Sequence, residues 1–582
     1  MRTILTTLHS KFIHPSLALP CMAAYCREEC GELCIREFTV HEPKENVLAA
    51  LIAEEPDVVA FSVYLWNRRE TLELADALAT VRPGIRIVLG GPEVSFDGPD
   101  LFDRHPGVSA LVRGEGEIPL RGLLSAWAKG VDSLDVPRLA QRRNKGVVEG
   151  PDAPPLADLD ELPSPFALGL ADLSRGFVYL ETSRGCPYTC SFCMSALDER
   201  VRSFSMARIR DDLRLLMDAG VPKVKLVDRT FNYDAARARE IWSFILRHNR
   251  QTHFHFEIGA HLLDEETLAL LETVPSGMFQ FEIGVQSTLP ATLDAIGRQA
   301  SLEKLEESVR RLRAAGNIHL HLDLIAGLPG EGYRDFLASV EKVASLCPHH
   351  LQIEPVKLLP GAPLRRDARR LGLRFDPHPP YGILSTPELT FAEIDRLRGL
   401  SRLFDLTFNS GRFGGFLEGL KAACGSLSAG LERLEDFWRT RDLFRHPLSQ
   451  RAVFEACWNF VRSTFGGEVR ETLRDGLARD LALCERVAPG NAPDFFDLTL
   501  TEEEREAVRE QVRRETEAVK GQGIKIQHFA AVFERLRRLS GRTVLLFLYL
   551  TRSGEGMRVK EIPLDLDRTP ELPAQGREMD DS

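Results

Sequence analysis

The stretch ETSRGCPYTCSFCMSALDE, residues 181–199, holds three cysteines within eight positions: Cys186, Cys190 and Cys193. It follows an apolar segment predicted as a strand, and the Gly and Pro on either side of Cys186 indicate that the chain turns into a loop. A loop can direct several thiolates towards one centre, as an iron–sulfur cluster requires. Three thiolates on a four-iron cluster leave one iron free to bind a small molecule. The sequence therefore predicts these cysteines as ligands of an iron–sulfur cluster.

Two other groups of residues bear on this interpretation. Zinc is the competing metal, but a structural zinc site takes a fourth Cys or His, and the candidates His253 and His255 are distant in the sequence. A second triple, Cys26, Cys30 and Cys34, has a similar spacing in a different context. The first two share one face of a predicted helix, and the third lies in the strand that follows. Because cysteine often acts as a small buried apolar side chain, we expect this triple to be structural.

Around the cysteine loop, segments predicted as strands alternate with segments predicted as helices. Six strands are expected between residues 176 and 375, at 177–183, 223–232, 254–260, 278–287, 318–330 and 350–361. A complete TIM-type barrel has eight β/α units and about 250 residues. The predicted fold class is therefore α/β, with a partial (β/α)6 TIM-type barrel whose functional loops follow the strands.

Residues 1–135 show the same alternation. The expected strands lie at 2–8, 33–40, 57–65, 85–91 and 108–114, with helical patterns such as 44–55 and 68–81 between them. Strands that are regularly separated by helices pair in parallel and form a doubly wound sheet. We predict a Rossmann-like, more specifically flavodoxin-like, domain whose ligand site lies beyond the carboxyl ends of its strands.

The remaining segments differ in composition. Residues 136–175 are rich in Pro, Asp and Leu and are predicted as a linker. Residues 376–562 are predicted as a mostly helical domain, and the polar residues 563–582 as a disordered tail. The apolar run VLLFLYL, residues 544–550, is too short to span a membrane and is predicted as a buried strand.

The cysteine loop resembles the radical S-adenosylmethionine (radical SAM) superfamily. The spacing C-x3-C-x2-C, Arg184-Gly185 before the first cysteine and Phe192 before the last fit the pattern of that family, as do FEIGVQS, IGR and GLPGE further on. The resemblance implies a [4Fe-4S] cluster on the three cysteines that binds S-adenosyl-L-methionine (SAM). One electron, from a donor such as flavodoxin or ferredoxin, then cleaves SAM to methionine and a 5′-deoxyadenosyl radical, which abstracts hydrogen from the substrate.

The same resemblance implies which residues hold SAM. They lie in the cysteine loop or near the ends of later strands, and they are Phe192, Asp228, Glu257, Glu282, Gln286, Arg298 and Asp323. Arg298 is expected near the SAM carboxylate, and Gly327 and Gly330 are expected where the backbone turns or approaches the adenosine. The alternative for each acidic residue is that it caps a helix or pairs with Arg or Lys at the mouth of the barrel.

Two glycine-containing phrases of the N-terminal domain, VLGGPEVSF (88–96) and LVRGEGEIPL (111–120), include the ends of predicted strands. In this order ahead of a radical SAM core they resemble the cobalamin-binding domain of the B12-dependent radical SAM class, in a bacterial subgroup with an uncharacterised C-terminal domain. The resemblance implies that cobalamin contacts Tyr64, Leu65, Gly90, Gly91, Pro92, Glu93, Gly114 and Glu115. The D-x-H-x-x-G signature that supplies a histidine to cobalt is absent. Tyr64, Leu65 or Trp66 is therefore expected to shield the lower face of cobalt, with ordinary loop packing as the alternative.

The function implied by the resemblance is that of a cobalamin-dependent radical SAM enzyme, a methyltransferase acting on an unactivated carbon or phosphorus of an unidentified small molecule or peptide. The alternatives are radical cyclisation or oxidation without methyl transfer, a cobalamin or redox sensor, and a tRNA methylthiotransferase, which would need three further cluster cysteines. The formal net charge of -11 disfavours nucleic acid as a partner. Eleven cysteines without a visible secretion signal favour the reducing cytoplasm.

Overall fold

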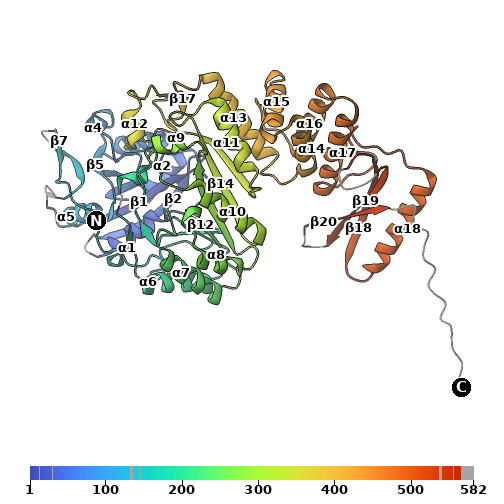
Figure 1. The fold of residues 1–582 in the computed structure, drawn as a ribbon. Coiled ribbons are helices and arrows are strands. Elements are labelled where there is room, and N and C mark those ends of the chain that lie inside the picture. The colour runs from blue at the N-terminus through green and yellow to red at the C-terminus, as the bar shows by residue number, and fades with distance from the viewer. Residues whose placement is uncertain are drawn as a thin grey trace. The chain divides into compact units, whose positions relative to one another are not determined.

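The computed structural model describes residues 1–11, 14–28, 30–131, 136–143, 146–198, 200–536, 541–552, 554 and 556–564. The chain forms two compact units, Met1–Asp395 and Arg396–Ser582 (Figure 1). Helix α13 (Phe391–Leu406) spans the boundary between them. Within the described residues, no helix is both long enough and apolar enough to span a membrane.

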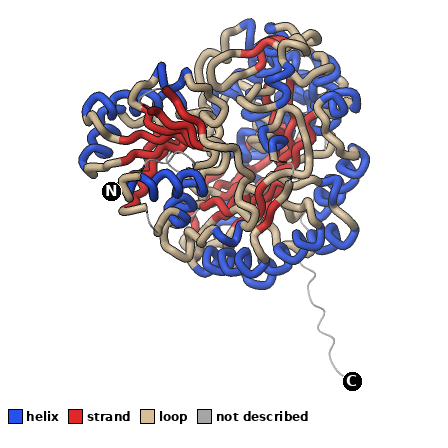
Figure 2. Tube along the Cα trace, turned by 90° about the vertical axis from the view of Figure 1, so that its left-hand side faces the viewer, coloured by secondary structure: helices blue, strands red, loops and turns tan. Residues whose placement is uncertain are grey.

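The first unit begins with five parallel strands in the order β2-β1-β3-β4-β5. Figure 1 labels β1, β2 and β5 of this sheet, and Figure 2 shows a group of strands in red beside the N-terminus. The bounds of the five strands are β1 (Arg2–His9), β2 (Glu32–Thr39), β3 (Val58–Ser62), β4 (Arg86–Gly90) and β5 (Val108–Val112). This is the strand order of flavodoxin-like domains, which confirms the predicted doubly wound sheet. The direction in which strands are added reverses between β1 and β3, so a ligand crevice is expected beyond the carboxyl ends of these two strands.

Alternate residues of these strands pack on opposite faces of the sheet, as the two-residue period of a strand requires. One face packs against α2 (Lys44–Ala53), α3 (Arg68–Val81) and α4 (Asp100–Arg104), and the other against α1 (Ala18–Tyr25) and α5 (Glu117–Ala128). Cys26 and Cys30 are fully buried in the core on the α1 side, and Cys34 lies in β2. This triple therefore has the structural role that its helical context predicted.

The segment predicted as a linker, 136–175, contributes two further strands. They are β6 (Leu139–Arg143) and β7 (Gly146–Glu149), which pair antiparallel and extend the sheet beyond β5. The sequence did not reveal them because β6 buries few apolar side chains and continues into Gln141, Arg142 and Arg143. Short, charged strands of this kind are typical of sheet edges.

Six parallel strands form a second sheet in the first unit, in the order β15-β14-β13-β12-β11-β8. Their bounds are β8 (Val178–Leu180), β11 (Lys223–Leu226), β12 (His253–Glu257), β13 (Phe279–Gln286), β14 (His319–Ala326) and β15 (His350–Pro355). Helices between them include α6 (Met206–Asp218), α7 (Ala235–His248), α8 (Glu265–Glu272), α9 (Pro290–Ala295), α10 (Leu302–Ala315) and α11 (Tyr333–Ala344). Because β8 and β15 do not pair with each other among the described residues, the sheet is open, which confirms a partial (β/α)6 barrel.

Burial alternates along the strands of this second sheet. In β13, Phe279 and Phe281 are fully buried, whereas Gln280 and Glu282 on the opposite face are partly accessible. The buried face packs against Trp242 of α7, whose ring centroid lies 5.7 Å from that of Phe281. The other face carries polar side chains from several strands. We call it the inner face of the partial barrel.

The end of the first unit contains α12 (Pro363–Asp367) and a hairpin of β16 (Arg374–Phe375) and β17 (Ile383–Ser385). The second unit contains α14 (Gly414–Cys424), α15 (Leu427–Thr440), α16 (Gln450–Thr464), α17 (Gly467–Cys484) and α18 (Glu502–Ala518). An antiparallel sheet follows, made of β18 (Ile524–Phe533), β19 (Thr543–Arg552) and β20 (Arg558–Leu564). The mostly helical character is as predicted and 544–550 is a buried strand within β19, but the sheet as a whole was not predicted. Residues 565–582 of the predicted disordered tail lie outside the described residues.

Candidate functional site

A cavity of about 890 Å³ lies at the carboxyl ends of the strands of the N-terminal sheet. One side is lined by residues that end or follow β1, β3, β4 and β5, among them His9, Gly90 and Gly114. The other side is lined by residues of the partial barrel and the cysteine loop, including Tyr179 and Met194. The cavity thus lies where a doubly wound sheet binds its ligand, and the cysteine loop forms part of its wall.

Most residues predicted to contact cobalamin line this cavity, namely Tyr64, Gly90, Gly91, Pro92, Gly114 and Glu115. Leu65 and Glu93 are not among the lining residues. Glu93 is only 4% exposed; its carboxylate accepts a hydrogen bond from the Tyr381 hydroxyl and lies 3.7 Å from Arg68. Burial raises the pKa of Glu93. We therefore correct the prediction for Glu93, which packs behind the glycine loop and connects it to the hairpin segment after the barrel.

The loop after β3 presents aromatic rings to the cavity. The rings of Tyr64 and Trp66 stack with centroids 4.7 Å apart, and the Trp66 indole N–H donates to the Leu8 carbonyl at 3.1 Å. Asn67 is fully buried, and its side-chain amide donates to the Leu8 carbonyl at 2.9 Å and accepts from the Tyr64 N–H at 2.8 Å. Asn67 therefore positions this loop. Its role could not be predicted, because its partners come from β1, some sixty residues away.

Gly91 is a position where the backbone requires glycine. Its φ is +103°, and a Cβ there would lie 2.5 Å from the carbonyl oxygen of Val63 and 2.8 Å from the Val63 nitrogen. Contacts this short with backbone atoms force the chain to move. The absence of a side chain at Gly91 therefore keeps the ends of β3 and β4 close together beside the cavity.

The cysteine loop places a hydrogen-bonding group beside each thiol. Cys186 Sγ lies 3.5 Å from Thr230 Oγ1, Arg298 Nη1 lies 3.7 Å from Cys190 Sγ, and the Ser195 N–H donates to Cys193 Sγ at 3.4 Å. Cys186 and Cys190 are buried, and Cys193 is half-buried. Hydrogen bonds to sulfur stabilise the thiolates that hold iron–sulfur clusters. The donor set therefore fits such a cluster.

The three thiols also act on one another. Burial raises the pKa of Cys190, Arg298 lowers it, and the neighbouring Cys193 and Cys186 raise it. Among the described residues, no three His, Cys, Asp or Glu side chains could hold a single metal ion together. In a four-iron cluster each thiolate binds a different iron, so the sulfurs need not meet at one point. The candidate zinc ligands are engaged elsewhere: His253 bonds to the Gly277 carbonyl at 2.7 Å, and His255 lies 3.2 Å from Glu282.

Backbone contacts fix the conformation of the cysteine loop. The Cys186 N–H donates to the Asp198 carbonyl at 3.1 Å, and the Ser191 N–H donates to the Ile296 carbonyl at 2.8 Å. Gly185 has a φ of +90°, and a Cβ there would lie 2.5 Å from the Arg200 carbonyl oxygen. The Arg-Gly pair before the first cysteine therefore serves the geometry of the loop.

Three of the carboxylates predicted to bind SAM lie on neighbouring strands of the inner face. Glu257, Glu282 and Asp323 come from β12, β13 and β14. Glu282 pairs with His255, and Asp323 lies 3.1 Å from His321 Nε2. Burial, and repulsion from Glu282 and Asp323, raise the pKa of Glu257 to about 7, although Arg229 opposes this shift. The structure therefore brings these three carboxylates together in one half-buried group.

Other residues predicted for SAM lie around this group. Gln286 has a φ of +71°, and its side-chain oxygen is buried without a partner among the described residues. The Arg298 guanidinium donates to the Gly284 carbonyl as well as to Cys190. Phe192 is half-buried in the cysteine loop. These residues combine unsatisfied polar capacity with partial exposure, which suits a ligand site.

Asp228 is placed differently from its prediction. It is fully buried, and it accepts hydrogen bonds from the Thr182 N–H at 3.1 Å and from the Thr182 and Ser183 hydroxyls at 2.5 Å each. A carboxylate enclosed by protein donors has no surface left for SAM. We therefore correct this prediction: Asp228 ties the chain after β8 to the end of β11, directly below the cysteine loop.

Two polar networks missed by the sequence predictions join the N-terminal domain to the barrel. Arg184 lies 3.2 Å from Glu115, 2.7 Å from Glu117 and 2.9 Å from Glu181. Because Arg184 comes two residues before Cys186, this network links the cysteine loop to the chain after β5. Charged residues alone did not reveal it, since their partners are distant in sequence.

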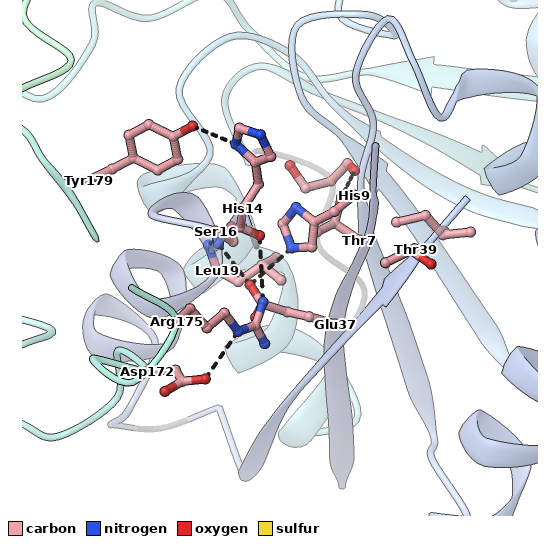
Figure 3. A network of polar contacts seen from close by, with 12 residues as sticks. Thr7, His9, His14, Ser16, Leu19, Glu37, Thr39, Asp172, Arg175 and Tyr179 are labelled. Carbon is pink, nitrogen blue, oxygen red and sulfur yellow. Dashed lines mark hydrogen bonds and ion pairs between the residues drawn. The ribbon is translucent and has the colours of Figure 1, made fainter. Parts of the chain in front are cut away.

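The second network is shown in Figure 3. Glu37 of β2 pairs with His9 at 3.2 Å and with Arg175 at 2.5 Å, and accepts the Ser16 N–H at 2.8 Å. Burial by itself raises the pKa of the Glu37 carboxyl. The contacts with His9, Ser16 and Arg175 outweigh this effect and hold the pKa below its ordinary value. Beside this group, His14 Nδ1 lies 3.0 Å from the Tyr179 hydroxyl. His9, His14 and Tyr179 all line the cavity.

Comparison with protein families finds three matching models. Residues 4–124 match the B12 binding domain, residues 180–343 match the radical SAM superfamily, and residues 369–533 match a protein of unknown function, DUF4080. The first two matches cover the two sheets that border the cavity. The third covers the end of the first unit and most of the second.

Comparison with curated proteins finds relatives that match about half of the chain. The chain is 31% identical over 350 residues to the cobalamin-dependent radical SAM methyltransferase TokK of Streptomyces tokunonensis, covering 56% of this chain and 51% of that protein. It is 25% identical over 312 residues to the anaerobic magnesium-protoporphyrin IX monomethyl ester cyclase of Rubrivivax gelatinosus, covering 50% of this chain and 54% of that protein. The chain thus spans about half the length of these relatives.

A solved structure shows the same fold. The cobalamin-dependent SAM radical enzyme OxsB, with aqua-cobalamin bound, superposes with a TM-score of 0.59 at 18% identity, covering 83% of this chain and 84% of that one. At this identity the likeness concerns the fold. The family matches, for their part, lead to one conclusion: the chain contains a region that matches the B12 binding domain, a region that matches the radical SAM superfamily and a region that matches DUF4080.

Proposed function

We propose that this protein is a cobalamin-dependent radical SAM enzyme that transfers a methyl group to an unactivated carbon or phosphorus. One observation carries the proposal: the cysteine loop and the glycine-lined strand ends of the B12-binding domain form walls of the same cavity. When bound, the cluster with SAM supplies a radical and cobalamin supplies a transferable methyl group. A substrate in this cavity would be within reach of both.

The position of each residue would determine which group it binds. Cys186, Cys190 and Cys193 would hold the cluster, and Arg298 would lie beside it, where it can meet the SAM carboxylate. The remaining SAM contacts would come from Phe192 of the cysteine loop and from the half-buried polar residues of the inner face, which are Glu257, Glu282, Gln286 and Asp323. Carboxylates there suit a ligand with an ammonium and a sulfonium.

On the other wall, cobalamin would lie against the loops that follow β3, β4 and β5. Gly90, Gly91 and Gly114 leave room for the corrin, and the stacked rings of Tyr64 and Trp66 present a flat apolar surface. Leu65 is not among the residues that line the cavity, so Tyr64 and Trp66 are the residues of this loop that would shield cobalt if cobalamin binds there. No histidine at a D-x-H-x-x-G signature is needed for this arrangement.

The reaction also needs an electron donor, and we propose a small redox protein such as flavodoxin or ferredoxin in the reducing cytoplasm. The substrate would be a small molecule or a peptide.

The direct test is anaerobic reconstitution of the full chain with iron, sulfide and cobalamin, followed by reduction in the presence of SAM carrying a deuterated methyl group. We expect 5′-deoxyadenosine to form, and the label to pass to cobalamin and then to the substrate. Complete absence of 5′-deoxyadenosine would contradict the proposal and favour a cobalamin or redox sensor instead.

A second candidate is a radical reaction without methyl transfer, such as cyclisation or oxidation. The similarity to the magnesium-protoporphyrin ester cyclase favours it, because that relative is 25% identical to this chain over 312 residues. The labelled SAM distinguishes the two reactions. Methyl transfer places deuterium in the product, whereas a cyclisation leaves the label in methionine.

We expect SAM affinity to depend on pH through Glu257. With a pKa of about 7, this carboxyl is about one-tenth ionised at pH 6 and about nine-tenths ionised at pH 8. Only the ionised form attracts a cationic ligand, so SAM should bind about tenfold more tightly at pH 8 than at pH 6. Calorimetric titration of the reconstituted protein measures this.

Two variants serve as controls for that titration. Glu257→Gln should bind SAM weakly at both pH values and flatten the profile, because the ionisable group is gone. Glu307→Gln, an exposed position on α10, should keep the wild-type profile. A Glu257→Gln protein that retains the tenfold change would show that another group is responsible.

A further inference from the structure

The inner face of β11 carries basic side chains that the proposed reaction does not use. Buried residues alternate with Lys223 and Lys225 along this strand, so both lysines face the inside of the partial barrel. The alternation continues beyond the strand, where Val227 and Arg229 line the cavity. A row of alternate residues therefore leads from the cavity onto the inner face, and three of its four members are basic.

The ammonium of Lys225 lies on an aromatic ring and not beside a carboxylate. Its Nζ is 4.8 Å from the centroid of the Phe177 ring. Among the described residues, Lys225 forms no ion pair. The nearby carboxylate of Glu282 is paired with His255 instead. The hydrogen bond from His255 lowers the pKa of Glu282 most, and the charge of Lys225 lowers it further. A half-buried cation of this kind has unused capacity for an anion.

Lys225 belongs to the side of the barrel that faces the cavity. It lies opposite Tyr179 in the pairing of β11 with β8, and Tyr179 lines the cavity. Phe177 meets the rings of His14 and Tyr179 edge-on, at 5.4 and 5.3 Å. Burial and then Lys225 lower the pKa of His14, so at neutral pH the histidine is uncharged and hydrogen-bonds to Tyr179, as Figure 3 shows. Lys225 is thus the charged member of this group.

Positive and negative groups lie on different strands of the inner face. The carboxylates Glu257, Glu282 and Asp323 lie on β12 to β14, whereas Lys225 and Arg229 lie on and after β11. Among the described residues these two cations form no ion pair, although Arg229 lowers the pKa of Glu257 and Lys225 lowers that of Glu282. Lys223 is set apart from these two, because it donates to Gln280 at 3.0 Å. The acidic side suits the cationic SAM, and the basic side next to the cavity suits a ligand of opposite charge.

We propose that the substrate carries an anionic group, a carboxylate or a phosphate, that Arg229 meets it at the cavity wall, and that Lys225 binds it from the neighbouring part of the inner face. The inference rests on the proposed function, since that function places the substrate in this cavity. The lysine contributes a compact point charge, and the guanidinium contributes a planar pair of donors for two oxygens. The two residues therefore act as specificity-determining residues for an acidic substrate.

The test uses the full chain, reconstituted anaerobically with cluster and cobalamin, and measures equilibrium binding of two probes, inorganic phosphate and succinate. We expect saturable binding of at least one probe to the wild type, weakened about tenfold or more in Lys225→Gln, the loss expected when one ion pair is removed. Lys225→Arg, which keeps the charge, should retain binding. Lys44→Gln, at an exposed position on α2, is the matched control and should bind as the wild type does.

The anion that Lys225 binds could belong to the substrate or could be the carboxylate of SAM. SAM affinity, measured in the same variants, distinguishes these two cases. It should be the same in Lys225→Gln as in the wild type. A parallel loss of SAM affinity would assign the cations to the SAM carboxylate and overturn the proposal, as would probe binding that is absent from the wild type or unchanged in Lys225→Gln. Lack of 5′-deoxyadenosine from the wild type would overturn the proposed function alone, because probe binding is measured without turnover.

Discussion

Replacing Cys190 by alanine is expected to lower the iron content of the reconstituted protein from about four atoms per chain to near zero and to abolish 5′-deoxyadenosine formation. Cys190 is 5% exposed and lies between the other two cysteines of its loop, with Arg298 beside its sulfur. Two remaining thiolates do not hold the cluster, and the described part of the loop contains no fourth cysteine that could replace Cys190. Iron and sulfide analysis of anaerobic preparations, with chromatography of the SAM products, measures the effect.

Cys30→Ala is the matched control. Cys30 is also fully buried, but it belongs to the apolar core between the N-terminal sheet and α1. We expect this variant to keep its iron and to lose only about 1 kcal/mol of unfolding free energy. About eight iron atoms per chain in the wild type, halved by Cys30→Ala, would indicate a second cluster, as in tRNA methylthiotransferases. Iron retained by Cys190→Ala would remove the basis for placing a cluster in the 186–193 loop.

The second large effect is expected from Gly91→Ala, which should weaken cobalamin binding at least tenfold. The added Cβ would lie 2.5 Å from the Val63 carbonyl oxygen, so the ends of β3 and β4 would have to separate. Gly91 and the residues that follow β3 line the cavity together, and their separation changes the surface against which a corrin would lie. Absorbance of the cobalamin that remains bound after anaerobic gel filtration measures the loss.

Gly84→Ala controls for backbone strain. Gly84 has a φ of +98°, close to the +103° of Gly91, but a Cβ at Gly84 would meet no atom within 4 Å. Both variants carry the strain of a left-handed alanine, about 1 kcal/mol; only Gly91→Ala also carries the clash. We expect Gly84→Ala to bind cobalamin normally. Equal losses in both variants would show that destabilisation, and not the shape of the cavity, causes the effect.

Much of the fold could be predicted because its strands are apolar and regularly separated by helices. The five N-terminal strands and the six barrel strands each bury residues on at least one face, so their periodicity shows in the sequence. Strands β6 and β7 escaped prediction because both are short, and β7 at the sheet edge buries no residue. The sheet of β18, β19 and β20 escaped it, except for 544–550, because burial does not alternate regularly along β18 and β20 has no buried residue.

The site was predictable where chemistry is local and unpredictable where it depends on distant partners. Three cysteines in one loop imply a cluster without further information. Asp228 and Glu257 look alike in sequence, since each follows an apolar strand, yet Asp228 is enclosed by hydroxyls while Glu257 stays accessible with a raised pKa. No local pattern distinguishes them, because the donors around Asp228 come from β8 and the turn after it.

The sequence by itself therefore determined the cysteine loop, the alternation of strands and helices, and the glycines that end strands, since each depends on residues close together in the chain. Only the tertiary structure decided that the cysteine loop and the glycine-lined strand ends share a cavity, that Arg184 joins them through carboxylates from both domains, and that Lys225 lies on the Phe177 ring and forms no ion pair with any described residue. Electrostatic and steric interactions act through space, and folding brings together groups that lie far apart along the chain.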